Sequence, residues 1–257
     1  DTALHVELGR IDVRAVNCRS PWRATITPAG DQVYVACYAS DTVVIIDTAT
    51  HTIVAAISGI GRPFDIAFTP EGDYALVGSA NANQIAVINT QTHALSAITT
   101  PWPTRNIDVH PYLKRAYVSG DGNALLVVDT STFSLAQPIQ QAGIPEGVAV
   151  SADGRYVFVT TRYGATLIVL DAFENSVHAI LSGINSRYVV DVVAVPDGSA
   201  IYVAGLSHGV HVIDGSTFQL LTTIGVGIDA AYLATTCDGD EVWTGGFSDW
   251  VPIIDTS

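Results

Sequence analysis

The chain has 257 residues, of which 48% are hydrophobic and only 14% charged, and its formal net charge is −14. No apolar run reaches the roughly 18 residues of a membrane-spanning helix, which argues against membrane insertion. An acidic chain with a single lysine is repelled by phosphate groups, which argues against nucleic acid as a partner.

One acidic position recurs along the chain at a nearly constant interval. An apolar run ends in Asp or Asn, and a short polar turn follows it, every 40–43 residues. These residues are Asp47, Asn89, Asp129, Asp171, Asp214 and Asp255. Asp1 precedes the first of them by 46 residues, so we predict six copies of one unit.

Each copy contains four apolar runs. In the second copy they are "FDIAFTP" (64–70), "YALVGSA" (74–80), "QIAVINT" (84–90) and "HALSAIT" (93–99). Their length and their Val, Ile and Ala content indicate strands, and Pro-Asp-Gly-type segments such as "PEGD" (70–73) indicate tight turns between them. The pattern predicts an all-β fold with almost no helix, namely a six-bladed β-propeller with four antiparallel strands per blade.

We predict a single propeller domain over residues 1–257. Its blades are expected at about 20–58, 63–100, 104–142, 145–183, 188–224 and 229–257 together with 1–9. The chain ends on a third-type strand, "WVPIIDT" (250–256), and begins with a fourth-type strand, "ALHVELG" (3–9). We therefore expect the N-terminal strand to close the ring as the outer strand of the last blade, which removes an exposed edge.

Three segments carry a resemblance to a known family. They are "QVYVACYASDTVVIIDTAT" (32–50), "RYVFVTTRYGATLIVLD" (155–171) and "AIYVAGLSHGVHVIDGST" (200–217). They resemble the YVTN-type propeller repeat, and the resemblance covers essentially the whole chain. It implies the propeller fold, although many relatives have seven or more blades. The family includes surface-layer and periplasmic proteins, cofactor-bearing dehydrogenase subunits and lactonase-like enzymes, so it implies no single activity.

The chain begins inside a repeat and contains no methionine. We interpret it as a mature or trimmed piece of an exported protein, periplasmic or extracellular, that belongs to a larger chain or complex; a tag-cleaved product is the alternative.

Cys18 and Cys37 are expected at the same end of the first blade, where they are either free or joined in a disulfide that would fit an oxidising compartment. Cys237 is expected to be free. Three cysteines without a C-x-x-C pair make a poor metal site, so no metal or cofactor is predicted.

Arginines and acids are expected on opposite ends of the ring. We call the end with the second-to-third and fourth-to-first strand connections the top face. It is expected to hold Arg10, Arg14, Arg19, Arg23, Arg62, Arg105, Arg162 and Arg187. Acids in the turns of the bottom face are expected to cap their own turns. Arginines converging on the mouth of the channel would favour a small anionic ligand or a protein partner. The alternative is that each pairs with a local acid: Arg62 with Asp65, Arg105 with Asp108, Arg187 with Asp191.

Alignment of the six inner strands defines two positions at the top of the channel. The inner-ring position holds Arg23, Asp65, Asn106, Gly147, Asp191 and Tyr232, and the rim position before it holds Trp22, Phe64, Arg105, Glu146, Val190 and Ala231. Polar variation at positions that a repeat would otherwise keep alike indicates a grafted site. The predicted ligand-binding residues are Arg23, Arg62, Asp65, Arg105, Asp108, Glu146, Arg162, Arg187, Asp191, Asp229 and Tyr232, with Arg23, Arg105 and Arg187 converging on the mouth.

Catalysis has little support in the sequence. The chain contains no G-x-S-x-G, H-E-x-x-H, P-loop or dinucleotide motif, so a non-catalytic binding protein is the preferred interpretation. The alternative is an enzyme of lyase or lactone-hydrolase type that uses the same funnel, and whether the chain is an enzyme stays open. In that case His208 or Glu146 would accept the proton, and the donor would be Tyr163, Tyr188 or Tyr232.

Overall fold

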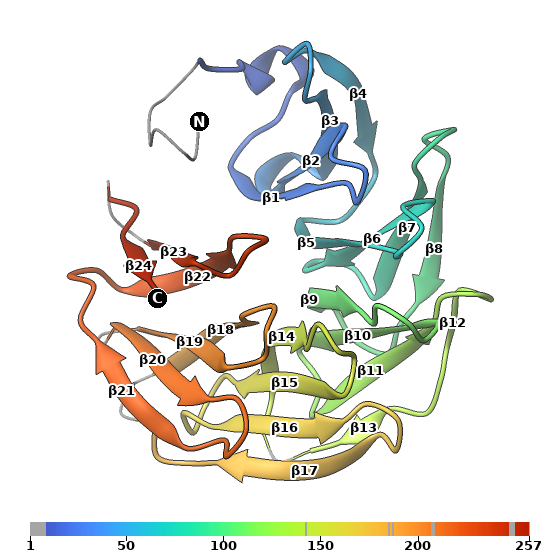
Figure 1. Cartoon of the computed structure of the whole chain (residues 1–257). Coiled ribbons are helices and arrows are strands. Elements are labelled where there is room, and N and C mark those ends of the chain that lie inside the picture. Colours follow the sequence, from blue (N-terminus) through green and yellow to red (C-terminus); the bar gives the residue numbers. More distant parts are fainter. Residues whose placement is uncertain are drawn as a thin grey trace.

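The computed structural model describes residues 9–141, 143–184, 186, 188–206, 209–246 and 250–256. Within them, six antiparallel sheets surround a central axis, as Figure 1 shows. The predicted six-bladed β-propeller is therefore confirmed. Helix in these residues is limited to two 3₁₀ turns, η1 (Val13–Val16) and η2 (Tyr38–Ser40).

Blades 1 to 3 follow one another along the chain, and each begins with its innermost strand. Blade 1 contains β1 (Pro21–Ile26), β2 (Gln32–Cys37), β3 (Thr42–Asp47) and β4 (Ile53–Ser58). Blade 2 contains β5 (Pro63–Phe68), β6 (Tyr74–Ser79), β7 (Gln84–Asn89) and β8 (Leu95–Thr99). Blade 3 contains β9 (Thr104–Val109), β10 (Arg115–Gly120), β11 (Ala124–Asp129) and the short pieces β12 (Ser134–Leu135) and β13 (Ile139–Gln140). Pro138 lies between these two pieces, where its missing N–H interrupts the outer strand.

Blades 4 to 6 complete the ring. Blade 4 contains β14 (Pro145–Val150), β15 (Tyr156–Thr161), β16 (Leu167–Asp171) and β17 (Ser176–Leu181). Blade 5 contains β18 (Tyr188–Ala194), β19 (Ala200–Leu206), β20 (Gly209–Asp214) and β21 (Leu220–Ile224). Blade 6 contains β22 (Ala230–Thr235), β23 (Glu241–Gly246) and β24 (Ile253–Asp255).

The last blade departs from the prediction in its third strand. The sequence predicts a strand over 250–256, but β24 covers only Ile253–Asp255, because Pro252 just before it has no N–H for the ladder. The predicted closing strand, 3–9, lies outside the described residues apart from Gly9. Closure of the ring by that strand therefore stays a prediction.

Apolar side chains pack between neighbouring blades. Tyr34 and Ile45 of blade 1, for example, meet Ile66 and Val77 of blade 2. Equivalent clusters lie between blades 2 and 3, 3 and 4, 4 and 5, and 5 and 6. The core is thus distributed among the blade interfaces, which leaves the central channel free to hold polar groups.

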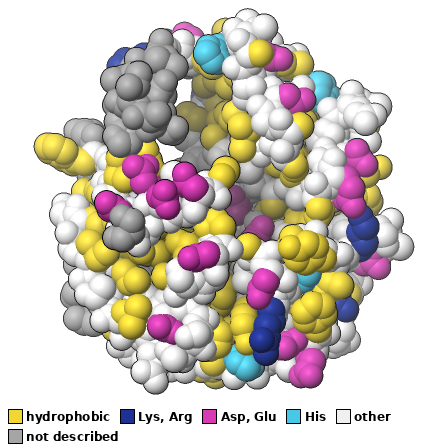
Figure 2. Space-filling model, in the orientation of Figure 1, with side chains coloured by type: hydrophobic (Ala, Val, Ile, Leu, Met, Phe, Trp, Pro, Cys, Tyr) yellow, Lys and Arg dark blue, Asp and Glu magenta, His cyan; other side chains and the backbone are white. Residues whose placement is uncertain are grey.

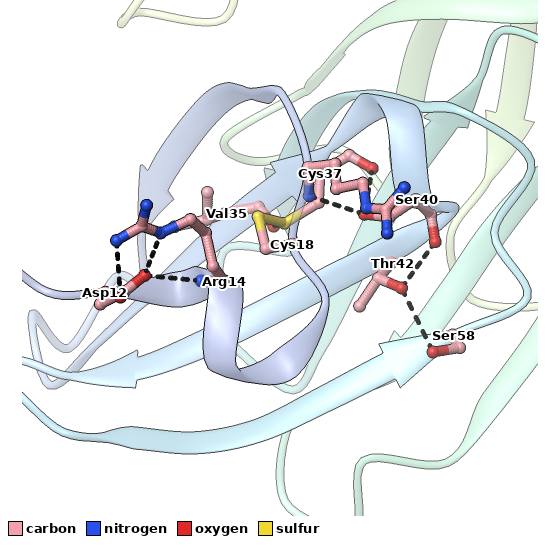
Figure 3. Close-up of a disulfide and its surroundings, with 9 residues drawn as sticks. Asp12, Arg14, Cys18, Val35, Cys37, Ser40, Thr42 and Ser58 are labelled. Carbon is pink, nitrogen blue, oxygen red and sulfur yellow. Dashed lines mark hydrogen bonds and ion pairs between the residues drawn. A yellow bond between two sulfur atoms is a disulfide. The ribbon is translucent and has the colours of Figure 1, made fainter.

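The opposite face of blade 1 is covered by the segment that precedes β1. Val13 and Val16 of η1 pack there beside Cys18 and Cys37. The two cysteines are joined in a disulfide with a Cα–Cα distance of 5.2 Å, as Figure 3 shows. The structure therefore selects the disulfide from the two alternatives left open by the sequence. Cys237 is free and exposed, as predicted.

Acids at the blade corners cap their own turns. Asp47 Oδ1 accepts hydrogen bonds from Ala49 N at 3.0 Å and from Thr50 N at 2.7 Å, and bonds from Thr50 lower the pKa of Asp47. The same pattern occurs at Asp129, Asp171 and Asp214. Acidic side chains are spread over the face seen in Figure 2. The corner acids have the structural role that the sequence predicts.

His110 shapes the divergent turn of blade 3. Its ring is buried, and Nδ1 accepts hydrogen bonds from Tyr112 N at 3.0 Å and Leu113 N at 2.8 Å. Burial lowers the pKa of His110, so the neutral ring can accept these bonds.

No helix in the described part of the chain is long and apolar enough to cross a membrane.

Candidate functional site

The inner strands of all six blades carry a β-bulge at the same height. In β1, Pro21 and Arg23 pair with Cys37 and Ala36, which leaves Trp22 as an extra residue. Val190 is the extra residue in β18, and Ala231 is the extra residue in β22. In the other three inner strands the register shifts between Pro63 and Ile66, between Thr104 and Ile107, and between Pro145 and Val148. Because a bulge bends its strand and re-aims side chains, this ring of bulges turns the rim residues toward the mouth of the channel.

The rim residues line a cavity of about 310 Å³, which we call the upper cup. Its lining residues are Trp22, Tyr38, Phe64, Arg105, Asn106, Glu146, Val190, Leu206, Ala231 and Tyr232. All six residues of the predicted rim position are among them. Tyr38 lies in the connection between β2 and β3, and Leu206 ends β19 just before the equivalent connection, so the cup opens at the top face. Its volume lies at the lower end of the range for small-molecule sites.

One wall of the upper cup is aromatic. The Trp22 ring contacts the rings of Tyr38, Phe64 and Tyr232, with centroid separations of 5.4, 5.8 and 5.5 Å. Trp22 Nε1 is buried and has no hydrogen-bond partner among the described residues. Burial raises the pKa of Tyr232 above its usual range, so its phenol stays neutral. Blades 1, 2 and 6 thus present a largely apolar surface to a ligand.

The other wall is charged. Asp121 Oδ1 accepts hydrogen bonds from both Arg105 Nε and Arg162 Nη2, each at 3.1 Å, and Arg162 Nε donates to Glu146 Oε2 at 2.6 Å. The Arg105 guanidinium lies 5.4 Å from the Phe64 ring centroid. Arg105 Nη1 and Nη2 make no hydrogen bond to a described residue, and neither does Glu146 Oε1. The wall therefore keeps one donor fork and one acceptor oxygen available.

A glycine allows Arg105 to occupy this place. The backbone of Arg105 passes so close to Gly78 of β6 that a Cβ at residue 78 would overlap the Arg105 carbonyl oxygen. Any side chain at Gly78 would displace the strand that carries Arg105.

Arg23 closes the channel beneath the upper cup. Its Nη2 donates to Asp191 Oδ2 at 2.8 Å and to Asn106 Oδ1 at 3.2 Å, and its Nε lies 3.6 Å from Asp65 Oδ1. Burial alone would lower the pKa of Arg23, but the Asp191 and Asp65 carboxylates raise it above its usual range. We call Arg23, Asp65, Asn106 and Asp191 the central cluster. Its members come from blades 1, 2, 3 and 5, so it connects opposite sides of the ring.

Acids on the inner strands also join neighbouring blades. Asp65, Asp108 and Asp191 each accept a hydrogen bond from the inner strand of the next blade, at 3.1, 2.7 and 3.0 Å. The donors are, in that order, the backbone N–H groups of Ile107, Val150 and Leu233. Burial raises the pKa of Asp108 to about 7 and that of Asp191 above its usual range. These acids therefore hold blades together, whatever else they contact.

A second cavity, of about 480 Å³, lies below the central cluster, and we call it the lower cup. Thr27, Pro28 and Cys237 of the first-to-second strand turns line its mouth, and Asp108 lines its wall. Figure 2 shows a hollow at the centre of the ring with acidic side chains inside it. The described residues contain no group of three or more His, Cys, Asp or Glu side chains arranged to hold a metal ion.

The structure brings together only part of the predicted site. Arg105, Glu146 and Tyr232 line the upper cup, and Arg162 contacts it through Glu146. Arg62 is exposed, with its guanidinium 5.4 Å from the centroid of the Tyr38 ring. Arg187 and His208 lie outside the described residues.

Other predicted residues lie away from the upper cup. Arg23, Asp65 and Asp191 belong to the central cluster, Asp108 lies in the lower cup, and Asp229 lines neither cup. The Tyr163 and Tyr188 rings pack edge to face with their centroids 5.7 Å apart. Convergence of Arg23 on the mouth is therefore wrong, because its guanidinium is already paired across the channel.

The predicted local ion pairs are also wrong where they can be compared. Arg105 pairs with Asp121 and not with Asp108, because the bulge sends Arg105 to the rim while Asp108 lies in the lower cup. Asp65 pairs with Arg23 and not with Arg62.

Sequence reasoning omitted the aromatic wall from the predicted ligand-binding residues. Trp22, Tyr38, Phe64, Asn106, Val190, Leu206 and Ala231 line the upper cup but were not among them. Trp22, Phe64, Val190 and Ala231 do share the rim position with Arg105 and Glu146. That shared position was the signal, and selecting only its charged residues left out four of its six members.

Comparison with known proteins identifies the fold but no family. No family model matches the chain, and no curated protein matches it. Hydrazine synthase from Kuenenia stuttgartiensis is 20% identical with a TM-score of 0.83, covering 92% of this chain and 77% of that one. The Cps50 (Swd1) β-propeller domain from Myceliophteria thermophila is 14% identical with a TM-score of 0.79, covering 92% and 82%. The YVTN resemblance stays a prediction, and at these identities the similarity to solved structures shows the β-propeller fold alone.

Proposed function

We propose that this chain is an exported, non-catalytic β-propeller that binds a small carboxylate ligand in the upper cup. The observation that carries the proposal is the open fork of Arg105. Its Nε is held by Asp121, while Nη1 and Nη2 make no hydrogen bond to a described residue at the edge of a cavity of about 310 Å³. A guanidinium fixed on one side and open on the other matches the two oxygens of a carboxylate.

The neighbouring groups favour an anion with an apolar body. Asp121 and Glu146 together balance Arg105 and Arg162, while the exposed Arg62, whose guanidinium lies over the Tyr38 ring, makes no ion pair with a described acid. The aromatic wall and the side chains of Val190 and Leu206 would cover the rest of the ligand. The Cys18–Cys37 disulfide supports a periplasmic or extracellular location, because such bonds persist in oxidising compartments.

Binding without turnover is favoured by the ion pair that Glu146 makes with Arg162. Glu146 Oε2 already accepts a hydrogen bond from Arg162 Nε at 2.6 Å, so this oxygen is engaged in an ion pair within the protein. Of the other predicted catalytic residues, Tyr232 lines the cup and Tyr163 lies against Tyr188 outside its lining. Glu146 and Tyr232 thus line the same cavity, but Glu146 Oε2 is already bound by Arg162.

Calorimetric titration with 3-phenylpropionate and its uncharged amide tests the proposal. We expect the wild-type chain to prefer the carboxylate, and Arg105→Met to lose that preference by roughly ten- to a hundredfold in affinity. Arg155→Met is the matched control, because Arg155 also stacks on an aromatic ring, 5.1 Å from the centroid of Tyr156, but outside the upper cup. Equal affinities for acid and amide, or equal losses in the two variants, would overturn carboxylate binding.

A second measurement tests the absence of catalysis. The chain is incubated with a panel of lactones and unsaturated acids, and product formation is followed over time. We expect no turnover above the rate without protein. Turnover that Glu146→Gln abolishes would show that the upper cup is the active site of an enzyme.

A further inference from the structure

We infer that the ligand of the upper cup is a zwitterion that carries an ammonium group and a flat apolar group beside its carboxylate, with an aromatic amino acid as the simplest example. The inference rests on the proposed function and names the class of ligand for the same site. It follows from a second open polar group, Glu146 Oε1, on the wall that holds the Arg105 fork.

Glu146 is held so that one of its two oxygens is used and the other is not. Arg162 Nε binds Oε2 at 2.6 Å, and Oε1 makes no hydrogen bond to a described residue. The side chain is only 12% exposed, and Glu146 lines the upper cup. Oε1 is not among the buried polar atoms of the described residues that lack a partner, so it is accessible from the cavity and can accept a hydrogen bond from a donor that enters it. A ligand ammonium supplies such a donor with the complementary charge.

The charges of the wall alternate in a way that suits a zwitterion. Arg105 and Arg162 share Asp121 Oδ1, and Arg162 in turn binds Glu146. The open cationic fork and the open anionic oxygen are thus separated by one carboxylate, Asp121, and one guanidinium, Arg162, and the four charges balance. A ligand with a net charge of zero, carrying both signs, would satisfy both open groups and leave the balance unchanged. A simple anion would satisfy only Arg105.

The opposite wall sets the shape of the ligand. The rings of Trp22, Tyr38 and Phe64 form a continuous surface, with centroid separations of 5.4 to 6.3 Å. A planar group lying against this surface gains apolar burial and aromatic contact without a hydrogen-bond requirement.

Three probes of matched size test the inference. They are L-phenylalanine, 3-phenylpropionate, which lacks the ammonium group, and 2-phenylethylamine, which lacks the carboxylate. Calorimetric titration should give the tightest binding for L-phenylalanine, with roughly a ten- to hundredfold preference over each of the other two probes. The diagnostic quantity is the ratio of the dissociation constants of 3-phenylpropionate and L-phenylalanine.

Glu146→Gln should reduce this ratio to about one, because it removes the ammonium partner. A merely structural loss, through release of Arg162, would weaken all three probes alike and leave the ratio unchanged. Glu71→Gln is the matched control, because Glu71 is also paired with a basic side chain, Lys114, but does not line the upper cup. It should leave both the affinities and the ratio at their wild-type values.

The outcomes separate this inference from the proposed function. If 3-phenylpropionate and L-phenylalanine bind equally well and both depend on Arg105, the zwitterion is wrong and carboxylate binding stands. If neither binds, both fail. If L-phenylalanine is preferred but Glu146→Gln keeps the preference, the ammonium is recognised elsewhere and the role assigned to Glu146 is wrong.

Discussion

Replacement of Arg23 by methionine should lower the melting temperature by about 6–20 °C. The substitution keeps much of the apolar stem but leaves Asp191, which is only 3% exposed, without its guanidinium partner. Removing one partner of a buried ion pair typically costs about 3–5 kcal/mol, because the remaining charge stays desolvated. In a chain of this size each kcal/mol corresponds to roughly 2–4 °C. Thermal unfolding followed by circular dichroism or calorimetry measures the shift.

The double variant Arg23→Met/Asp191→Asn isolates the cause of that loss. An asparagine at residue 191 can still accept the hydrogen bond from Leu233 N but carries no charge, so the double variant should regain part of the lost stability. Arg105→Met is the control, because Arg105 pairs with the more exposed Asp121 and should cost about 1 kcal/mol or less. A melting temperature of Arg23→Met within about 2 °C of wild type would refute the reasoning, and so would a double variant less stable than the single one.

Two further predictions concern the disulfide and Asp108. Reduction of Cys18–Cys37, two cysteines with a sequence separation of 19, should lower the free energy of unfolding by about 3 kcal/mol. Thermal melts with and without reductant measure this loss, and Cys237→Ser should leave it unchanged. Because burial raises the pKa of Asp108 from 3.8 to about 7, its contribution to stability is present below pH 4 and is lost as pH rises to about 7. The melting temperature of wild type should therefore fall more steeply between pH 4 and 7 than that of Asp108→Asn, and parallel curves would contradict the raised pKa.

The fold was predictable because its signals are local and repeated. Each blade contributes its own turn residues and its own apolar runs, so an error in one copy is corrected by the other five. The position of the rim residues was predictable for the same reason. When the inner strands are aligned on their turns, Trp22, Arg105 and Glu146 occupy equivalent positions in three blades. Each of these positions lies within the bulge of its strand.

The partners of the charged residues were not predictable by the same means. Arg23 binds Asn106 and Asp191, which lie 83 and 168 residues further along the chain. Such a contact depends on the length and direction of side chains from six strands around one channel. The spacing of residues along the sequence does not indicate which of these side chains will meet. Neighbours along a strand were a poor guide, because adjacent residues at a bulge diverge toward different cavities.

Two successive positions on the inner strands thus have different roles in the channel. The inner-ring position holds Arg23, Asp65, Asn106 and Asp191, whose charges and hydrogen bonds are used within the protein and which join blades across the ring. A ligand that competed for them would have to replace buried bonds, which is costly. The rim position, one residue closer to the top face, carries the groups that keep open hydrogen-bonding capacity, Arg105 and Glu146. Specificity can therefore change at the rim without loss of the contacts that hold the blades together. This separation explains why the rim position combines tryptophan, phenylalanine, arginine, glutamate, valine and alanine within one repeated fold.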